Sequence, residues 1–380
     1  MLEFHKTKKS AAVLKHGIID SYAPPFIGKT GSRSKGNRVA FIDGYAGPGR
    51  YSSEEEGSGA MLLRHAKAHA GMPRTVECHF VEEDADTIAA LRTVVEDEGD
   101  GVTVTVNDGD ISTHLPDLLQ QCDGIPLFVY LDPCGLVIPF AEVVQIFDRP
   151  AGRGQPATEV LINFSAGALR RIAGHLTSKT PTEGTLARMD EVCGGDWWRQ
   201  SWLVELPDKD AAEQAVVNGY AERLSKEAGH AGHWVIDVRQ RAGLKPLYYL
   251  VFASRHLAGL EYFGEASSLG LEKWRRVSAQ QAAVGTLFGD DDSWVENFKA
   301  EEARLKEEWI DTLANNLESE LAKGEPFRVL DRYDEVFGDL AGVARGLHLR
   351  AAMKKVLAAG LTTTSPVGVK ELLQLTLKPV

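Results

Sequence analysis

Short apolar runs, rich in β-branched and aromatic residues, recur along the first 260 residues of the chain, and segments with helical spacing separate them. The runs are residues 39–42, 77–81, 102–106, 126–131, 159–163, 233–238 and 247–253. Continuous apolar runs of this length that alternate with helices are typical of parallel strands buried on both faces. The last two runs can form a terminal pair, because residues 243–246 supply a turn between them. The pattern therefore predicts an α/β fold with a doubly wound, mostly parallel sheet of seven strands.

The N-terminal segment combines a helical pattern with basic charge. Residues 5–22 carry apolar residues at a helical spacing, and this helix is expected to end before Pro24 and Pro25, because proline interrupts a helix. Residues 1–40 hold eight basic residues and two acidic ones. The basic residues are Lys6, Lys8, Lys9, Lys15, Lys29, Arg33, Lys35 and Arg38. This segment could steer an anionic substrate such as a nucleotide or an RNA, or it could be a solvated face.

The segment that follows the fifth run, residues 165–230, has a mostly helical pattern. We expect it to form a helical cap inserted over the ends of the strands. The cap contains Trp197, Trp198 and Trp202. We interpret these tryptophans as core residues rather than as platforms for base stacking, because large aromatic side chains usually bury.

The C-terminal part of the chain follows another pattern. Residues 294–321 place apolar residues mostly four apart with acidic residues between them, which predicts one long amphipathic helix. Residues 325–380 give further helical material, including a basic helix at residues 347–359. They also predict a β-ribbon, in which the alternating residues are Leu373, Leu375 and Leu377. This combination indicates a small α-helical, winged-helix-like shape.

Two domains are therefore expected. Residues 1–289 hold the sheet and the cap, and residues 290–380 hold the long helix and the winged-helix-like part. Four basic side chains of the second domain could contact nucleic-acid phosphates: Arg345, Arg350, Lys354 and Lys355. A protein-binding role or a packing role accounts for them equally well, and the acidic long helix would oppose a polyanion.

Composition and charge narrow the class of protein. The net charge is −12 at pH 7, from 42 Lys and Arg against 54 Asp and Glu, which argues against a general nucleic-acid coat protein. No apolar run approaches the roughly 20 residues of a membrane helix, and the N-terminus lacks the apolar core of a signal peptide. The chain is therefore expected to be cytoplasmic, without a membrane partner. The four cysteines have no CxxC spacing, so we expect neither a metal site nor a disulfide framework.

The candidate chemistry begins at residues 38–50, RVAFIDGYAGPGR, where an apolar strand ends in Asp43 and leads directly into glycines. Such a turn lets the backbone approach a ligand at the carboxyl edge of a parallel sheet, where open α/β sheets bind nucleotides. We expect an adenosine-bearing ligand. Residues 47–52 loosely follow the GxGxxA fingerprint of NAD-linked oxidoreductases, but a polar insert at residues 50–57, before a helix that begins near Ser58, weakens that match. The oxidoreductase interpretation stays open as a less favoured alternative.

Acidic residues follow three more of the predicted strands. Glu82 comes after the second strand, where it can accept hydrogen bonds from the two hydroxyls of a ribose. Asp110 comes after the third strand and could accept from an adenine amino group, or it could be only a helix N-cap. Asp132 and Pro133 follow the fourth strand. Together with Asp43, these acids form an ordered set along one edge of the sheet.

Six segments carry a resemblance to a known family: FIDGYAGPGRY (41–51), GSGAMLL (57–63), FVEEDAD (80–86), VYLDPCGL (129–136), VLINF (160–164) and YYLVFASRH (248–256). On these segments the chain resembles the S-adenosylmethionine-dependent methyltransferases of Rossmann-like fold, and within them it is similar to the three-Cys-motif partner protein (TcmP) family. The resemblance implies a transferase with S-adenosylmethionine as cofactor and a nucleotide, a nucleic acid or a small molecule as methyl acceptor. An acidic glycine turn also suits an ammonium and a sulfonium better than a pyrophosphate.

The resemblance implies roles for individual residues. Asp43 would contact the methionine part of the cofactor, Glu82 would hold the ribose, and Asp110 would hold the adenine. The whole set implied for the cofactor is Asp43, Gly44, Tyr45, Ala46, Gly47, Gly49, Glu82, Glu83, Asp110, Ile111 and Asp132. The set implied for catalysis is Asp132, Pro133 and Cys134.

Cys134 departs from the family pattern, which leads us to expect an aromatic residue after Asp132 and Pro133. Asp132 keeps its implied role of binding the amino group of the acceptor. Cys134, however, offers no aromatic ring that could stack on a planar target. Cys134 could be a nucleophile, or it could be a buried and inert cysteine. The family name also implies a partner, a radical-SAM-like protein with a three-cysteine motif. The chain could then be a non-catalytic binding subunit of that partner.

Overall fold

The computed structural model describes residues 10–30, 34–51, 53–149, 156–229, 232–241, 243–284 and 293–380. The chain forms two compact units, residues 1–262 and 263–380. The domain boundary near residue 290 that the sequence suggested stays a prediction. Part of the basic N-terminal segment lies outside the described residues, namely Lys6, Lys8, Lys9 and Arg33.

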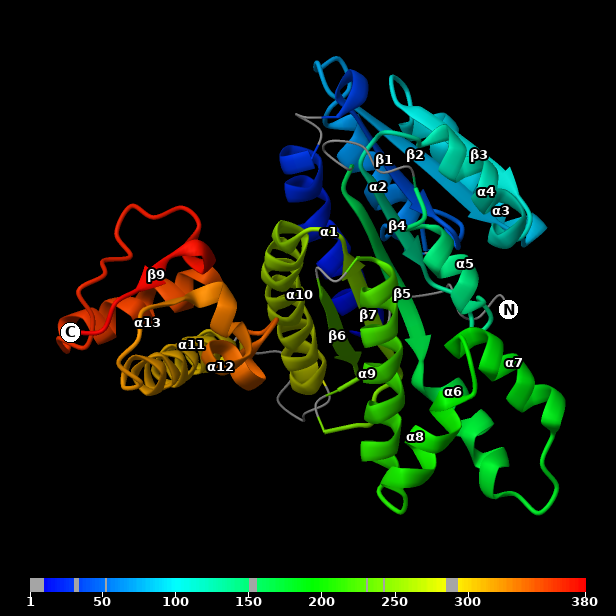
Figure 1. Cartoon of the computed structure of the whole chain (residues 1–380). Coiled ribbons are helices and arrows are strands. Elements are labelled where there is room, and N and C mark those ends of the chain that lie inside the picture. The colour runs from blue at the N-terminus through cyan, green and yellow to red at the C-terminus, as the bar shows by residue number, and fades with distance from the viewer. Residues whose placement is uncertain are drawn as a thin grey trace. The chain divides into compact units, whose positions relative to one another are not determined.

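The first unit is built on one seven-stranded sheet (Figure 1). Its strands are β1 (Arg38–Asp43), β2 (Thr75–Glu82), β3 (Thr103–Asp108), β4 (Leu127–Leu131), β5 (Thr158–Ser165), β6 (Gly232–Val238) and β7 (Tyr248–Ser254). Their order in the sheet is β3-β2-β1-β4-β5-β7-β6. Neighbouring strands pair in parallel, except that β7 is antiparallel to both β5 and β6. The predicted α/β fold with a mostly parallel sheet and a terminal strand pair is confirmed.

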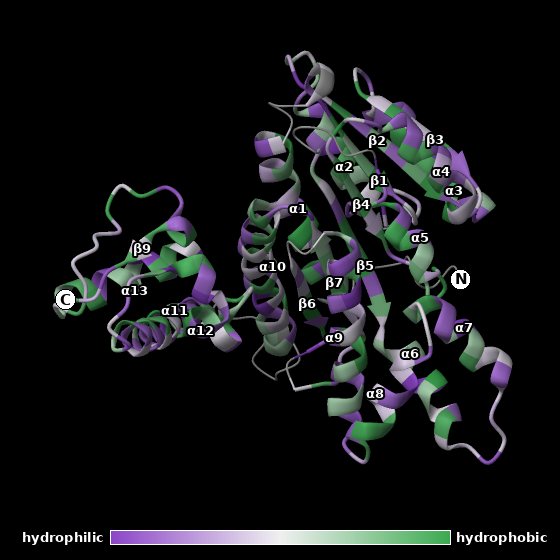
Figure 2. Cartoon of the chain, viewed as in Figure 1, coloured by the Kyte–Doolittle hydropathy of each residue, from purple (hydrophilic) through white to green (hydrophobic). Residues whose placement is uncertain are grey.

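Helices cover both faces of this sheet, as a doubly wound sheet requires. The helices of the first unit are α1 (Ser10–Thr30), α2 (Ser58–Lys67), α3 (Ala85–Glu98), α4 (Ile111–Gln121), α5 (Phe140–Gln145), α6 (Ala166–Ala173), α7 (Glu183–Cys193), α8 (Trp197–Glu205) and α9 (Lys209–Glu227). Residues of α4 to α9 share one buried cluster with the strands. On the other face, Tyr22 and Phe26 of α1 pack against Phe128 with ring centroids 5.5 and 5.9 Å away. Figure 2 shows hydrophobic residues along the central strands and mixed residues on the helices around them.

The helix α1 contains Pro24 and Pro25, so the expectation that it would end before these prolines is wrong. A proline inside a helix removes a backbone donor and costs about 3 kcal/mol. The chain beyond the prolines places Phe26 and Ile27 in the core, where they are 2% and 0% exposed. Burial of two such side chains stabilises by about 1.5–3 kcal/mol each, which offsets a large part of the cost of the two prolines.

The helical character predicted for residues 165–230 is confirmed by α6 to α9, and Figure 1 shows α6 directly beyond the carboxyl end of β5. Trp198 and Trp202 are 0% and 4% exposed and belong to the main core cluster. Trp197 is partly buried and packs against that cluster. The guanidinium carbon of Arg223 lies 4.5 Å from the centroid of the Trp197 ring. The interpretation of these tryptophans as core residues is therefore confirmed.

The second unit is mainly helical. Its elements are α11 (Ser293–Leu321), β8 (Phe327–Arg328), α12 (Tyr333–Phe337), α13 (Gly346–Ala358) and β9 (Thr376–Leu377), and α10 (Leu257–Val284) begins in the first unit and continues into the second. The long amphipathic helix is confirmed by α11, whose Leu313 and Leu317 are fully buried. No helix in the described part of the chain is both long enough and apolar enough to cross a membrane.

The predicted leucine ribbon of this unit is only partly correct. The strand β9 covers two residues and pairs antiparallel with β8. Residues 372–374 instead form a 3₁₀ turn, in which Leu372 and Leu373 are both buried. Successive side chains of a strand point to opposite faces, so two consecutive leucines cannot both be buried on one face of a strand. The predicted ribbon therefore does not include Leu373.

Candidate active site

The glycine turn after β1 is tied to both neighbouring strands. The backbone N–H of Gly44 donates to the carbonyl of Tyr130 at 2.9 Å, and that of Ala46 donates to the carbonyl of Val81 at 3.0 Å. Gly47 has a φ of 62°, a conformation that side chains rarely adopt, and a Cβ built on it would meet no heavy atom within 4 Å. The backbone at Gly47 therefore faces open space, where a ligand can approach it.

Three other residues of the predicted cofactor set are packed into the fold. A Cβ on Gly44 would lie 2.8 Å from the side chain of Leu131, and a Cβ on Gly49 would lie 3.2 Å from the side chain of Leu91. Ile111 is 2% exposed and belongs to the main core cluster. These residues shape the turn, so any contact they make with a ligand would be limited largely to backbone atoms or to one edge of a side chain.

Asp43 is fully buried at the end of β1. Its Oδ1 accepts the backbone N–H of Tyr45 at 3.3 Å, whereas its Oδ2 has no hydrogen-bond partner among the described residues. Burial raises the pKa of Asp43 to about 7, although the nearby Ser58 hydroxyl and the hydrogen bond from the Tyr45 backbone oppose the rise. A cationic ligand beside this carboxyl group would satisfy the remaining oxygen and favour its ionised form.

Glu82 is fixed by three backbone donors. Its Oε2 accepts from the N–H of Gly47 at 2.9 Å, and its Oε1 accepts from Glu83 at 3.1 Å and from Asp84 at 3.0 Å. The carboxylate thus joins the end of β2 to the glycine turn. These three donors use three of the about four acceptor sites of the carboxylate, so one site on Oε2 can still accept from a ligand. The side chain of Glu83 is exposed.

Asp110 is the N-cap of α4, because its Oδ1 accepts the backbone N–H of Ser112 at 2.7 Å. The N-cap alternative is confirmed, and it leaves the second carboxylate oxygen for other partners. The phenol of Tyr45 lies within reach of this charge: burial and Asp110 both raise the pKa of Tyr45. Tyr45 is partly buried and packs against the main core cluster.

Asp132 lies at the centre of a polar cluster beyond the end of β4. Its Oδ2 forms an ion pair with Lys15 of α1, and its Oδ1 accepts from the side-chain amide of Asn163 at 2.6 Å. The side chains of Lys15 and Asp132 are only 12% and 19% exposed. The structure therefore brings three elements, α1, β4 and β5, together at this carboxylate.

Neither Lys15 nor Asn163 stands out in the sequence as a candidate site residue. Lys15 was only one member of a basic segment, and its partner lies 117 residues away. Asn163 is the last residue of the predicted strand EVLIN and follows three apolar residues. This position is the feature of the sequence that could have identified Asn163 as a site residue. A polar residue at the carboxyl end of a buried parallel strand belongs among the candidates for a site, as the acids at the ends of β1, β2 and β4 do.

Tyrosines surround the same cluster. Tyr130 is fully buried, and its hydroxyl has no hydrogen-bond partner in the described ranges. The Nζ of Lys15 lies 6.0 Å from the ring centroid of Tyr248, whose hydroxyl donates to the carbonyl of Ala11 at 3.0 Å. The ring centroid of Tyr51, in the polar insert, lies 6.0 Å from that of His16, which is next to Lys15 on α1. Burial raises the pKa of Tyr51, and Lys15 opposes that rise.

Cys134 is exposed, so the interpretation of this residue as a buried cysteine is wrong. The partial burial of its thiol and the nearby Asp132 carboxylate raise the pKa of Cys134, and a thiol with a raised pKa is a poor nucleophile at neutral pH. The preceding carbonyl, that of Pro133, accepts the backbone N–H of Gly135 at 2.9 Å. The loop after Asp132 is therefore a tight turn that carries an unactivated thiol.

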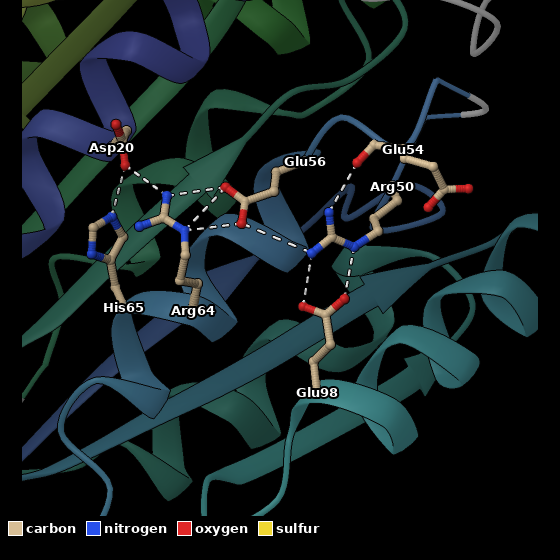
Figure 3. Close-up of polar contacts among 7 residues, drawn as sticks. All are labelled: Asp20, Arg50, Glu54, Glu56, Arg64, His65 and Glu98. Atoms are coloured by element: carbon tan, nitrogen blue, oxygen red, sulfur yellow. Dashed lines mark hydrogen bonds and ion pairs between the residues drawn. The ribbon is translucent and has the colours of Figure 1, made fainter.

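The polar insert is pinned to three helices (Figure 3). Arg50 donates to both oxygens of Glu98 on α3 at 2.7 and 2.9 Å. Arg64 on α2 donates to Glu56 of the insert at 2.9 Å and to Asp20 on α1 at 2.8 Å. Each exposed pair stabilises by less than about 1 kcal/mol, but a network of pairs fixes geometry. These ion pairs fix the position of the insert and, with it, the position of Tyr51 near the polar cluster.

The four basic residues of the second unit were candidates for phosphate contacts, and three of them have partners within that unit. Arg345 pairs with Glu272 at 3.0 Å, and Lys355 pairs with Asp311 at 2.7 Å. Arg350 donates to backbone carbonyls in the loop at residues 366–369. Lys354 is exposed. No group of His, Cys, Asp and Glu side chains in the described residues is arranged to hold a metal ion.

No family model matches the chain, and no curated protein matches it. A search of solved structures found the complex of Trm1 from Pyrococcus horikoshii with S-adenosyl-L-methionine. The two chains are 13% identical, with a TM-score of 0.33, and the match covers 67% of this chain and 59% of the other. The chain thus spans less than two thirds of that structure, and a similarity this low assigns neither a family nor a function.

Proposed function

We propose that this chain is a methyltransferase that uses S-adenosylmethionine as cofactor. One observation carries the proposal: the carboxylate of Glu82 accepts a hydrogen bond from the N–H of Gly47 at 2.9 Å, beside open space at the edge of the sheet. Asp43, Asp110 and Asp132 follow neighbouring strands of the same edge. An edge lined by carboxylates suits a cofactor with a ribose, an ammonium and a sulfonium, and it disfavours a phosphate.

The residues present fit such a cofactor. Asp43 has a buried oxygen without a partner, which an ammonium would satisfy. Glu82 would accept from one ribose hydroxyl through Oε2, and Tyr45 and Asp110 would line the adenine end. When bound, the cofactor supplies a methyl group on a cationic sulfur. Asp132 would hold the acceptor, which we take to be a nucleotide, a nucleic acid or a small molecule.

The oxidoreductase alternative receives less support. A pyrophosphate in such enzymes lies at the N-terminus of the helix that follows the glycine turn. Here the N–H of Gly57, just before α2, donates to the carbonyl of Gly49 at 2.7 Å, and a Cβ on Gly57 would lie 2.8 Å from that oxygen. The start of α2 is therefore covered by the chain itself.

A non-catalytic role beside a radical-SAM-like three-Cys-motif protein is the second candidate, as the similarity to the TcmP family implies. Cys134 favours it, because the expected aromatic residue is missing and the thiol that replaces it has a raised pKa. The experiment that separates the two is transfer of a labelled methyl group from S-adenosylmethionine to host lysate, with and without the purified partner. Labelled product that requires the wild-type chain supports the enzyme. Cofactor binding without labelling under either condition supports the binding subunit.

A further inference from the structure

The ion pair between Lys15 and Asp132 joins the N-terminal helix to the proposed acceptor site. Both side chains are largely withdrawn from solvent, at 12% and 19% exposed. Removing charged groups from water is costly unless they are paired and hydrogen-bonded. The second oxygen of Asp132 accepts from Asn163 at 2.6 Å, so this condition is met on both oxygens. The pair is thus a built feature of the site and not an adventitious surface contact.

The charges of this pair act on the glycine turn as well. The pKa of Asp43, which burial raises, is raised further by Asp132 and lowered by Lys15. The two charges of the pair therefore act in opposite directions at the end of β1, where the proposed cofactor would place its own charge.

We propose that Lys15 is a positioning residue of the acceptor site, which holds the Asp132 carboxylate in place and compensates its charge, so that this group receives a neutral N–H donor. This inference rests on the proposed methyltransferase function and on the role implied for Asp132, the binding of the amino group of the acceptor, and it adds the part that Lys15 plays there. An acceptor nitrogen that is neutral before transfer, such as an aromatic amino group or an amide, matches a carboxylate whose charge is already compensated. A cationic amine would compete with Lys15 for the Asp132 carboxylate and would gain little binding energy from it.

The remaining hydrogen-bonding capacity of the cluster agrees with this class. A carboxylate has about four acceptor sites, of which Lys15 and Asn163 use two. The amide nitrogen of Asn163 faces Asp132, and its Oδ1 is buried without a partner among the residues described. An NH₂ group could donate one hydrogen to Asp132 and the other to Asn163. A hydroxyl acceptor has only one hydrogen and would leave one of the two unsatisfied.

The test compares two cofactor analogues by calorimetry on the full chain. S-adenosylhomocysteine has no charge at the reacting position, whereas sinefungin has an amine-bearing carbon there, which is cationic at neutral pH. The quantity of interest is the ratio of their Kd values in the wild type, in Lys15→Met, and in the charge-preserving control Lys15→Arg. Circular dichroism verifies that each variant is folded.

In Lys15→Met the sinefungin amine can replace the missing cation, so we expect sinefungin to gain about tenfold over S-adenosylhomocysteine relative to the wild type, the low end for close charge pairs. Lys15→Arg should keep the wild-type ratio. Asp132→Asn should shift the ratio the other way, because Lys15 then repels the amine, and it serves if Lys15→Met does not fold. An unchanged ratio in Lys15→Met or in Asp132→Asn, with S-adenosylhomocysteine still bound, overturns the inference alone. A wild type that does not bind S-adenosylhomocysteine overturns the proposed function itself.

Discussion

The hydroxyl of Tyr22 on α1 donates a hydrogen bond to the buried carboxyl group of Glu159 on β5. The hydroxyl of Ser254 on β7 donates to the other oxygen of that carboxyl group at 3.1 Å. Glu159 is 1% exposed, so burial raises its pKa from 4.5 to about 7, although both hydrogen bonds oppose the rise. This contact holds the helix that carries Lys15 against the sheet.

Glu159 predicts a pH dependence of stability. Because its pKa is higher in the folded state, the folded chain binds more protons than the unfolded chain between about pH 4.5 and 7, and this group makes stability fall as pH rises through that window. The difference corresponds to at most roughly 3 kcal/mol. Glu159→Gln should therefore unfold at a higher urea concentration than the wild type at pH 8, with a smaller gain at pH 5. An equal gain at both values would contradict the assignment.

The space around Glu159 gives a second prediction. A Cβ on Gly259 would lie 2.2 Å from the Oε1 of Glu159 and 2.5 Å from the hydroxyl of Ser254. Gly259→Ala should destabilise the chain by about 1–3 kcal/mol in urea denaturation, the usual cost of overpacking. The control is Gly184→Ala in α7, where a Cβ meets nothing within 4 Å, and this change should stabilise by about 0.5–1 kcal/mol. Equal effects of the two substitutions would show that the contact is absent.

Asp132 should be needed for transfer and not for cofactor binding. Asp132→Asn keeps the shape of the side chain and removes its charge, so methyl transfer to the acceptor should fall by about a hundredfold or more. The affinity for S-adenosylhomocysteine should stay within about tenfold of the wild-type value. The matched control is Asp123→Asn, in an exposed turn before β4, which should change neither quantity. Full turnover by Asp132→Asn would remove this carboxylate from the site.

The second unit should bind nucleic acid weakly. Arg345, Arg350 and Lys355 have partners within the unit, which leaves Lys354 as the member of the predicted basic set without an ion pair among the described residues. We therefore expect little binding of host RNA or of duplex DNA at moderate salt in a filter or fluorescence assay. Strong binding whose affinity falls steeply with salt would contradict this expectation, and the loss of about one unit of slope in Lys354→Glu would then locate one phosphate contact.

Much of the first unit could be predicted from the chain because its information is local. The apolar runs and the acids that follow them give the strands and their carboxyl ends, so the edge with Asp43, Glu82 and Asp132 is readable without a structure. The N-cap at Asp110 was also a stated alternative, because an acid just before a helix has that local use.

The errors arise where distant contacts decide the outcome. Lys15 and Asp132 are 117 residues apart, and nothing local to either residue indicates their pairing. The helix α1 passes through Pro24 because the residues after it reach the core. The alternative of a buried Cys134 followed the general preference of cysteine for the core, whereas this residue lies exposed in the tight turn after Asp132. In each case tertiary packing overrides a local rule.

The measurement that tests the central claim most directly is calorimetric titration of the full chain with S-adenosylhomocysteine, with NAD as competitor. We predict measurable binding that NAD does not displace. Glu82→Ala should weaken it by about 1.5–3 kcal/mol, the range for a hydrogen bond to a charged group. Asp86→Ala, which removes an exposed acid in the first turn of α3, should leave the affinity unchanged. Binding of NAD without binding of S-adenosylhomocysteine, or equal affinities of the wild type and Glu82→Ala, would contradict the methyltransferase assignment at this edge of the sheet.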